Sequence, residues 1–298
     1  MQIAHCGRQT RSKITGYKPV APSAIRNTFY NEDMPKELSE DDINRLIDNF
    51  VSAIIRVKQS EFDGVQLHLA HGYLLSDFLS SHSNKRKDGW GGSTENKYRI
   101  IGEIIKRAKE QAGNFPILVK MNAHDGRKNG MRIEEAVQIA KMLETSGCSA
   151  IEVSCGIVED GLYSIRGEQL PVDAIMEYMF KYKNLPRFIK KISKPVLKTL
   201  KQQIPLLKYN LDAAIQIKKS VNLPVIVVGG INNIDDIRSI IEHDNIDFVS
   251  MCRPFIIEPN IVNKFFEGIQ TKSKCIICNY CWIIGNEKPL RCYYGKLP

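Results

Sequence analysis

The chain has 298 residues, of which 43% are hydrophobic and 25% charged, an ordinary composition for a globular protein. This length suits one large α/β domain or two small ones, and the formal charge is +9. No run of 18 apolar residues and no charged-then-apolar leader occurs, so a membrane span and export are not expected. We therefore expect a cytoplasmic protein whose eight cysteines favour metal or cluster binding over disulfides.

The first elements lead to a strand that ends in a polar loop. Residues 1–38 look like a strand end followed by a loop rich in Gly and Pro. A helix is expected over 39–59, with Ser39 and Asp42 forming a capping box. A buried strand over 65–69 follows and runs into a glycine-rich loop.

After this point the chain alternates between strands and helices. Further strands are expected over 116–121, 150–154, 224–228 and 247–251, and helices over 93–110, 133–145, 211–219, 234–243 and 259–266. Residues 156–208 are expected to be irregular. Short strands that are apolar on both faces indicate a parallel sheet covered by helices. This pattern is typical of a (β/α)8 TIM barrel and also of doubly wound sheets. As a TIM barrel, the chain would lack its first two strands and most of the third.

Titratable side chains gather where two of these strands end. His68, His71 and Tyr73 stand at the exit of the 65–69 strand, where α/β enzymes present catalytic groups. Either histidine alone is more often structural, but the three together favour function. Lys120 lies inside an apolar strand, so it must face an anion or a polar cavity, unless it reaches water at the strand's end.

Two neighbouring loops have features of a phosphate site. Gly229 and Gly230 follow one strand, and Cys252 and Arg253 follow the next. Glycines let backbone N–H groups approach a ligand closely, and an arginine fork suits phosphate. The alternative is that the two glycines only form a turn.

The positive charge is concentrated between residues 178 and 208, which hold nine Lys or Arg and no Asp or Glu. This basic window is either a solvated surface or a rim that attracts a phosphorylated ligand such as a nucleotide or a CoA thioester. No nucleic-acid partner is expected, because neither a stacking platform nor a helix-turn-helix or zinc-finger spacing occurs. No membrane partner is expected either.

Four cysteines lie close together near the carboxyl terminus: Cys275, Cys278, Cys281 and Cys292. Their spacing is typical of ferredoxin-type clusters with a remote fourth ligand, and four thiolates also suit zinc. We favour an iron–sulfur cluster over zinc, and we favour either of these over four free thiols. The expected division is therefore a barrel domain over 1–270 and a cysteine-rich tail over 271–298.

Several motifs carry a family resemblance. The segment from Phe62 to Arg99, Gln2-x-x-His5-x-Gly7-Arg8, Ala21-Pro22-Ser23 and the stretch from Cys252 to Pro259 occur in the order and spacing of one family. The chain resembles the old yellow enzyme family of FMN-dependent NADH:flavin oxidoreductases, in particular its 2,4-dienoyl-CoA reductase-like branch. The resemblance implies that NAD(P)H reduces FMN and that hydride then reaches an activated C=C bond, as in an alkene or an enoyl or dienoyl thioester.

The resemblance also implies residue roles. His68 and His71 would hold the substrate's carbonyl oxygen, and Tyr73 would protonate the α-carbon. Gln2 and Lys120 would contact the flavin's pyrimidine edge and its N1/O2 side. The phosphate of FMN would be bound by Gly229, Gly230, Cys252 and Arg253. In this branch a [4Fe–4S] cluster on four cysteines relays electrons from a second flavoprotein domain, here expected as a separate subunit.

The chain departs from the family pattern in four places. The strands that normally precede Gln2 are absent, Lys120 replaces arginine, and Cys252 replaces glycine. Ser60-Glu61 replaces Ala-Gly, so the helix-to-strand turn is expected to have lost its left-handed residue. These departures leave two alternatives open: an inactive or partner-dependent barrel fragment, or a redox or metal-binding subunit organised around the cysteines.

Overall fold

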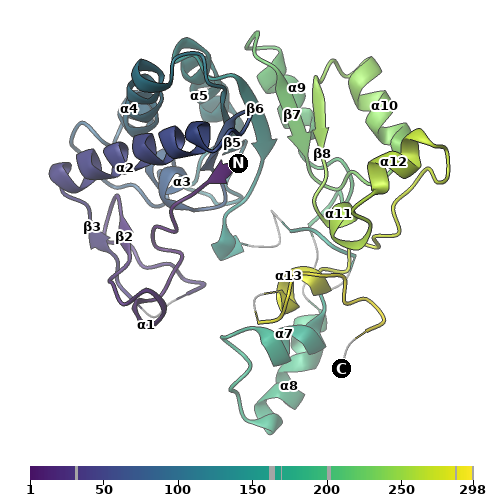
Figure 1. The fold of residues 1–298 in the computed structure, drawn as a ribbon. Helices are drawn as coiled ribbons and strands as arrows, with labels where there is room; N and C mark the ends of the chain where they lie inside the picture. The colour runs from purple at the N-terminus through teal and green to yellow at the C-terminus, as the bar shows by residue number, and fades with distance from the viewer. Residues whose placement is uncertain (31–32, 161–164, 169, 200–202, 286, 297–298) are drawn as a thin grey trace. The chain divides into compact units, whose positions relative to one another are not determined.

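The computed structural model describes residues 1–298 except 31–32, 161–164, 169, 200–202, 286 and 297–298 (Figure 1). The chain folds into two compact units, and each is described here by itself. The first unit comprises Met1–Ser164, Asn210–Val227 and Asn245–Phe248. The second comprises Ile165–Tyr209, Val228–Asp244 and Val249–Pro298.

A parallel sheet forms the centre of the fold, with the strand order β1-β4-β5-β6-β7-β8. The strands are β1 (Gln2–Ile3), β4 (Val65–Leu69), β5 (Ile117–Asn122), β6 (Ala150–Ser154), β7 (Val225–Val228) and β8 (Phe248–Ser250). The order follows the sequence, as it does in a (β/α)8 barrel. The prediction of a parallel sheet built from strand–helix repeats is confirmed.

Amphipathic helices follow the strands of the first unit in regular alternation. They are α2 (Glu40–Gln59), α4 (Thr94–Ala112), α5 (Ile133–Thr145) and α9 (Leu211–Lys218), and α2 packs against α4 and α4 against α5 (Figure 1). The predicted capping box is present, because Ser39 accepts from the Asp42 N–H while the Asp42 carboxylate accepts from the Ser39 N–H. The apolar face of α2 is buried, and it includes Ile43, Ile47 and Ile54.

The turn from α2 to β4 differs from the prediction. We expected that Glu61, which replaces a glycine of the family pattern, would remove the left-handed residue of this turn. That expectation was wrong, because Glu61 itself has φ 60°. A left-handed conformation of this kind costs a non-glycine residue about 1–2 kcal/mol, so the turn keeps its shape at an energetic cost.

Small elements of the first unit were not predicted. The short helix α1 (Ser12–Thr15) and a second sheet of β2 (Val20–Ala21) and β3 (Lys36–Glu37) form within the amino-terminal loop. Helix α3 (Leu74–Leu79) directly follows the loop at the end of β4. Because these elements have only two to six residues, they are too short to show a clear periodicity in the sequence.

The second unit is helical around the cysteine-rich segment. It contains α7 (Val172–Tyr178), α8 (Arg187–Lys198), α10 (Ile234–His243), α11 (Arg253–Ile257), α12 (Ile261–Phe266) and α13 (Tyr280–Ile284). The prediction that residues 156–208 are irregular was wrong, because the 3-10 turn η1 (Val158–Asp160), α7 and α8 lie there. Side chains of α7 and α13 share a small core with Tyr293. Among the described residues, no helix is long and apolar enough to cross a membrane.

Candidate active site

A strained turn shapes the end of β4. The Ala70 N–H donates to His68 Nδ1 at 3.2 Å, so a neutral His68 ring carries its proton on Nε2. His71 and Gly72 then take left-handed conformations, with φ 63° and 77°. The left-handed conformation favours glycine at position 72, and a Cβ there would lie 2.8 Å from Gln9 Nε2, so the Gln9 side chain would have to shift.

The three predicted catalytic side chains lie together at this turn. The His68 ring centroid is 5.1 Å from that of His71 and 4.8 Å from that of Tyr73. Burial and, to a smaller extent, the Lys120 charge lower the pKa of His68 to about 4. Burial and the neighbouring His68 and Lys120 lower the pKa of His71 to about 3. Both imidazoles are therefore neutral at physiological pH and can each donate one N–H.

Hydrogen bonds from two further strands hold His71 in place. Its Nε2 lies 2.8 Å from Ser154 Oγ at the end of β6, and its backbone N–H donates to Asn122 Oδ1 at the end of β5. The side-chain amide of Gln9 donates to the His71 carbonyl. Ser154 and Gln9 were not singled out from the sequence. The position of Ser154 at a strand end was the available signal for that residue.

The Tyr73 hydroxyl keeps its proton at neutral pH. Burial, and to a smaller extent the thiol of Cys6, raise the pKa of Tyr73 above its usual value. Because Tyr73 immediately precedes α3, the first turn of this helix fixes its backbone. A protonated phenol beside two neutral imidazoles is suited to binding an oxygen and donating a proton.

A polar row crosses the sheet beside these residues. Gln2 Nε2 donates to Gln66 Oε1 at 2.5 Å, and Gln66 Nε2 donates to Glu152 Oε2 at 2.8 Å. Glu152 forms an ion pair with Lys120 at 3.2 Å. The prediction that Lys120 faces an anion is therefore confirmed. Glu152 was missed because its partner is set by the register of β5 against β6, which pairs Lys120 with Glu152.

A buried ion cluster lies next to this turn and includes Asp77 of α3. Arg8 Nε donates to Asp77 Oδ1 at 3.0 Å, and Arg8 Nη2 donates to Glu159 Oε2 at 2.5 Å. Burial raises the pKa of Asp77 to about 6 against the opposing effect of Arg8. Burial opposes ionisation of Glu159 as well, but hydrogen bonding from His82 and the Arg8 charge lower its pKa to about 2. Arg8 thus pairs with two carboxylates, and Glu159 also accepts hydrogen bonds from Thr28 and lies within hydrogen-bond distance of His82.

The predicted phosphate residues belong to the second unit. Gly229 and Gly230 have φ 134° and 70°, conformations that favour glycine. A Cβ on Gly230 would lie 2.2 Å from the Leu206 carbonyl oxygen, so packing of the chain itself requires a glycine here. Cys252 is exposed and directly precedes α11. The assignment of these residues to a phosphate remains a prediction.

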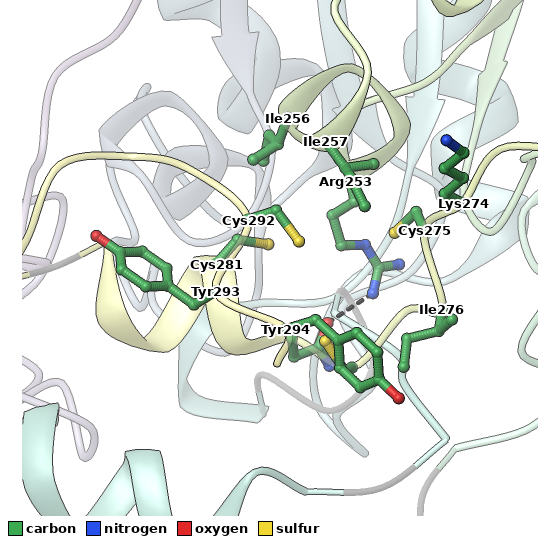
Figure 2. Close-up of a pocket in the computed structure, with 12 residues that line it drawn as sticks. Arg253, Ile256, Ile257, Lys274, Cys275, Ile276, Cys281, Cys292, Tyr293 and Tyr294 are labelled. Carbon is green, nitrogen blue, oxygen red and sulfur yellow. Dashed lines mark hydrogen bonds between the residues drawn. The ribbon is translucent and has the colours of Figure 1, made fainter. Parts of the chain in front are cut away.

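Arg253 lies in the wall of a pocket instead of an open loop. Its Nη1 donates to the Arg166 carbonyl oxygen at 2.7 Å and to Asn279 Oδ1 at 2.6 Å. Cys275, Cys278, Cys281 and Cys292 all line this small pocket. In Figure 2 the sulfur atoms of Cys281 and Cys292 lie near each other, with Cys275 beside Arg253.

The four thiols share the pocket without bonding to one another. All four are free cysteines. Burial raises the pKa of Cys275, and burial together with the nearby Cys275 raises the pKa of Cys281 to about 11. In the part of the chain that the structure describes, no three His, Cys, Asp or Glu side chains are placed to hold a metal ion. The pocket brings the predicted ligands together without arranging them as a closed metal site.

Glu258 organises the chain that enters this pocket. It is buried, and its carboxylate accepts from the Lys274 N–H at 2.7 Å, from Ser273 Oγ at 3.1 Å and from Lys264 Nζ at 3.0 Å. Burial would raise its pKa, but these hydrogen bonds lower it to about 2. Ser273 Oγ in turn accepts from the Cys275 N–H. The carboxylate therefore fixes the residues just before the first cysteine.

Comparisons with known proteins point to one family. Residues 1–199 match the NADH:flavin oxidoreductase / NADH oxidase family. The chain is similar to NADH oxidase of Thermoanaerobacter brockii, with 37% identity over 282 residues, which are 94% of this chain and 38% of that protein. It is also similar to a NADPH dehydrogenase of Bacillus cytotoxicus, with 41% identity over 160 residues, which are 53% of this chain and 44% of that protein. The chain thus spans less than half of the length of these curated relatives.

Solved structures show the same fold. A 2-naphthoyl-CoA reductase in complex with 2-naphthoyl-CoA superposes with a TM-score of 0.75 at 24% identity, covering 95% of this chain and 40% of that one. An old yellow enzyme homologue from Zymomonas mobilis gives a TM-score of 0.65 at 23% identity, covering 92% and 68%. The fold is thus that of old yellow enzyme barrels, of which this chain contains a part.

Proposed function

The chain belongs to the NADH:flavin oxidoreductase / NADH oxidase family, and on that premise we propose that it is an FMN-dependent oxidoreductase that reduces activated C=C bonds. FMN, when bound, would take hydride from NAD(P)H and pass it to the β-carbon of the alkene. The observation that carries the proposal is the cluster of His68, His71 and Tyr73, in which two neutral imidazoles and a protonated phenol converge.

The two histidines would bind the carbonyl oxygen of the substrate. Because His68 accepts the Ala70 N–H at Nδ1, its Nε2–H is available to donate to that oxygen. Negative charge grows on the oxygen as hydride arrives, so donors already in position stabilise the transition state more than the ground state. Ser154 and Asn122 would keep His71 in its left-handed turn while it does so.

Tyr73 would supply the proton that completes the reduction. A tyrosine hydroxyl is protonated at neutral pH, burial raises the pKa of Tyr73 further, and the Tyr73 ring contacts that of His68. Donation to the α-carbon would neutralise the enolate that the histidines stabilise. The donor and the oxygen-binding groups come from one turn, which fixes their relative geometry.

The polar row fits the electron-rich edge of a flavin. Lys120 carries a positive charge into the interior face of the sheet, where Glu152 balances it at 3.2 Å. Gln2 and Gln66 continue the row with amide groups that can donate and accept. Lys120 and Gln2 would therefore hold the pyrimidine side of FMN, and the positive charge of Lys120 would suit this electron-rich edge.

We propose Gly229, Gly230, Cys252 and Arg253 for the FMN phosphate. Packing against Leu206 already accounts for a glycine at position 230, and the Arg253 side chain already donates to Arg166 and Asn279. Binding would use the backbone N–H groups of Gly230 and Cys252 first. The 2-naphthoyl-CoA bound by a structural neighbour makes a CoA thioester one substrate class to test alongside simple enones.

Steady-state kinetics of the flavin-loaded protein test these roles. With NADPH and a cyclic enone, Tyr73→Phe should lower kcat by about 10²–10⁴-fold, the usual contribution of a general acid. His68→Ala combined with His71→Ala should also abolish binding of phenolic ligands, seen as loss of their charge-transfer band with the flavin. Unchanged ligand binding in this double variant would remove the histidines from the site. His82→Ala provides a control histidine, since His82 pairs with Glu159 instead.

We propose as a second, separate element that the cysteine pocket holds a [4Fe–4S] cluster. The support is that Cys275, Cys278, Cys281 and Cys292 are free, line one pocket and lie beside the Arg253 charge, which would offset thiolate ligands. A cluster there would relay electrons, and a separate flavoprotein subunit would be their source. Iron, sulfide and zinc analysis of anaerobically purified protein decides between this cluster, zinc and free thiols, and Cys281→Ser should lower the metal content.

A further inference from the structure

Helix α8 presents an uncovered apolar stripe in the middle of the basic window. Phe188, Ile192 and Val196 are spaced four residues apart and therefore share one side of the helix. They are 65%, 69% and 63% exposed. The other side of α8 packs against α7, as Figure 1 also shows. Three large apolar side chains in one exposed row indicate a surface that binds something.

Basic side chains border this stripe. Arg187, Lys191, Lys194 and Lys198 recur at spacings of four, three and four residues, which places them on a neighbouring stripe of the same helix. Lys194 pairs with Asp173 at 2.7 Å. Arg187, Lys191 and Lys198 are exposed. One basic residue of the window, Lys201, lies outside the described residues.

We propose that α8 is a membrane-surface helix that binds bilayers containing anionic lipids. A short helix with an apolar stripe, a Lys- and Arg-rich flank and low net hydrophobicity lies in the plane of a lipid interface. Phe188, Ile192 and Val196 would enter the boundary between headgroups and acyl chains. The long stems of Arg187, Lys191 and Lys198 would reach the lipid phosphates, and each cation near an anionic surface adds to the attraction.

The charge pattern favours this occupant over another protein. Residues 178–208 contain no Asp or Glu, so a second copy of the chain would bring like charges together. The stripe stands on the outward side of a helix of 12 residues, about 18 Å long, and a flat bilayer accommodates such a ridge directly. We expected no membrane partner because the sequence has no apolar run long enough to span a bilayer. A helix that lies on the membrane surface does not need such a run.

Vesicle co-sedimentation tests the proposal with the full chain. The probes are vesicles made of equal parts phosphatidylcholine and phosphatidylglycerol, and vesicles of phosphatidylcholine alone. The protein should bind the anionic vesicles, and binding should weaken as salt increases. Phe188→Ser with Ile192→Ser should weaken it by at least about tenfold, or about 1.4 kcal/mol. Lys191→Glu with Lys198→Glu should weaken it similarly.

Matched variants separate a specific helix from general surface effects. Phe266→Ser with Ile269→Ser removes two comparably exposed apolar side chains elsewhere in the second unit, and Lys106→Glu reverses an exposed charge on α4. Both should bind like wild type. All substituted positions are exposed, so circular dichroism should show unchanged folding.

Three results would overturn the proposal. The first is no binding to anionic vesicles, which would leave a protein partner as the occupant. The second is binding that the Phe188 and Ile192 substitutions do not change, which would mean only diffuse attraction of a protein of charge +9. The third is a dimer in light scattering that these substitutions convert to a monomer, because the stripe would then be an interface between copies.

Discussion

Arg8→Met should destabilise the first unit strongly, because Arg8 is the shared partner of two buried carboxylates. The side chains of Arg8, Asp77 and Glu159 are each 1% exposed, so water cannot replace the lost guanidinium. Removal of one member of such a buried ion pair costs about 3–5 kcal/mol. Urea unfolding at pH 8 should show a loss of this size. Arg45→Met is the control, since Arg45 pairs with Asp42 at the surface and should contribute less than about 1 kcal/mol.

The loss should also depend on pH. The folded-state pKa of Asp77, about 6, is above the ordinary value of 3.8 for an aspartate. The associated stability is therefore complete below pH 3.8 and lost as pH rises through 6. Without Arg8 the pKa of Asp77 should rise further, so Asp77 would be protonated at a higher pH and would no longer be a buried, unpaired charge. The deficit of Arg8→Met should shrink between pH 8 and pH 5, and Asp77→Asn in the same background should restore part of it. A small deficit at pH 8, or an equal one at both pH values, would refute this reasoning.

Two further predictions concern the turn at β4 and the carboxylate beside the cysteine pocket. In thermal unfolding, Gly72→Ala should destabilise the fold more than Gly113→Ala. Both glycines have positive φ, but only a Cβ at Gly72 would meet another group, Gln9 Nε2 at 2.8 Å. Equal losses of stability would show that backbone strain alone matters. Glu258 has a pKa lowered to about 2 from 4.5, so its stabilising effect is complete above pH 4.5 and lost as pH falls through 2. In Glu258→Gln, the free energy of unfolding should fall less steeply between pH 4.5 and pH 2 than in the wild type. An unchanged fall over this range would contradict the assigned hydrogen bonds.

The sequence predicted well the features that depend on local pattern. The strand that ends at Leu69 and the capping box of Ser39 and Asp42 both occur as expected. Each depends on periodicity or on a known preference within a few residues. The position of His68, His71 and Tyr73 at one turn also follows from their spacing alone.

Features that depend on distant residues were not predictable in the same way. Glu152 became the partner of Lys120 only through the register of two strands. Arg253 was expected beside a phosphate, but its partners Arg166 and Asn279 come from segments far away in the sequence. Helix α8 was not predicted because Pro195 is strongly disfavoured in a helix interior, and here the contact with α7 outweighs this local preference.

The visible spectrum of the purified chain tests the central claim most directly. The account predicts flavin absorption bands that bleach on addition of NADH or NADPH under anaerobic conditions and return when an enone is added. His68→Ala with His71→Ala should keep the flavin bands and the bleaching but lose the return. A folded protein that shows no flavin bands even after incubation with FMN would contradict the claim and favour a fragment that depends on a partner.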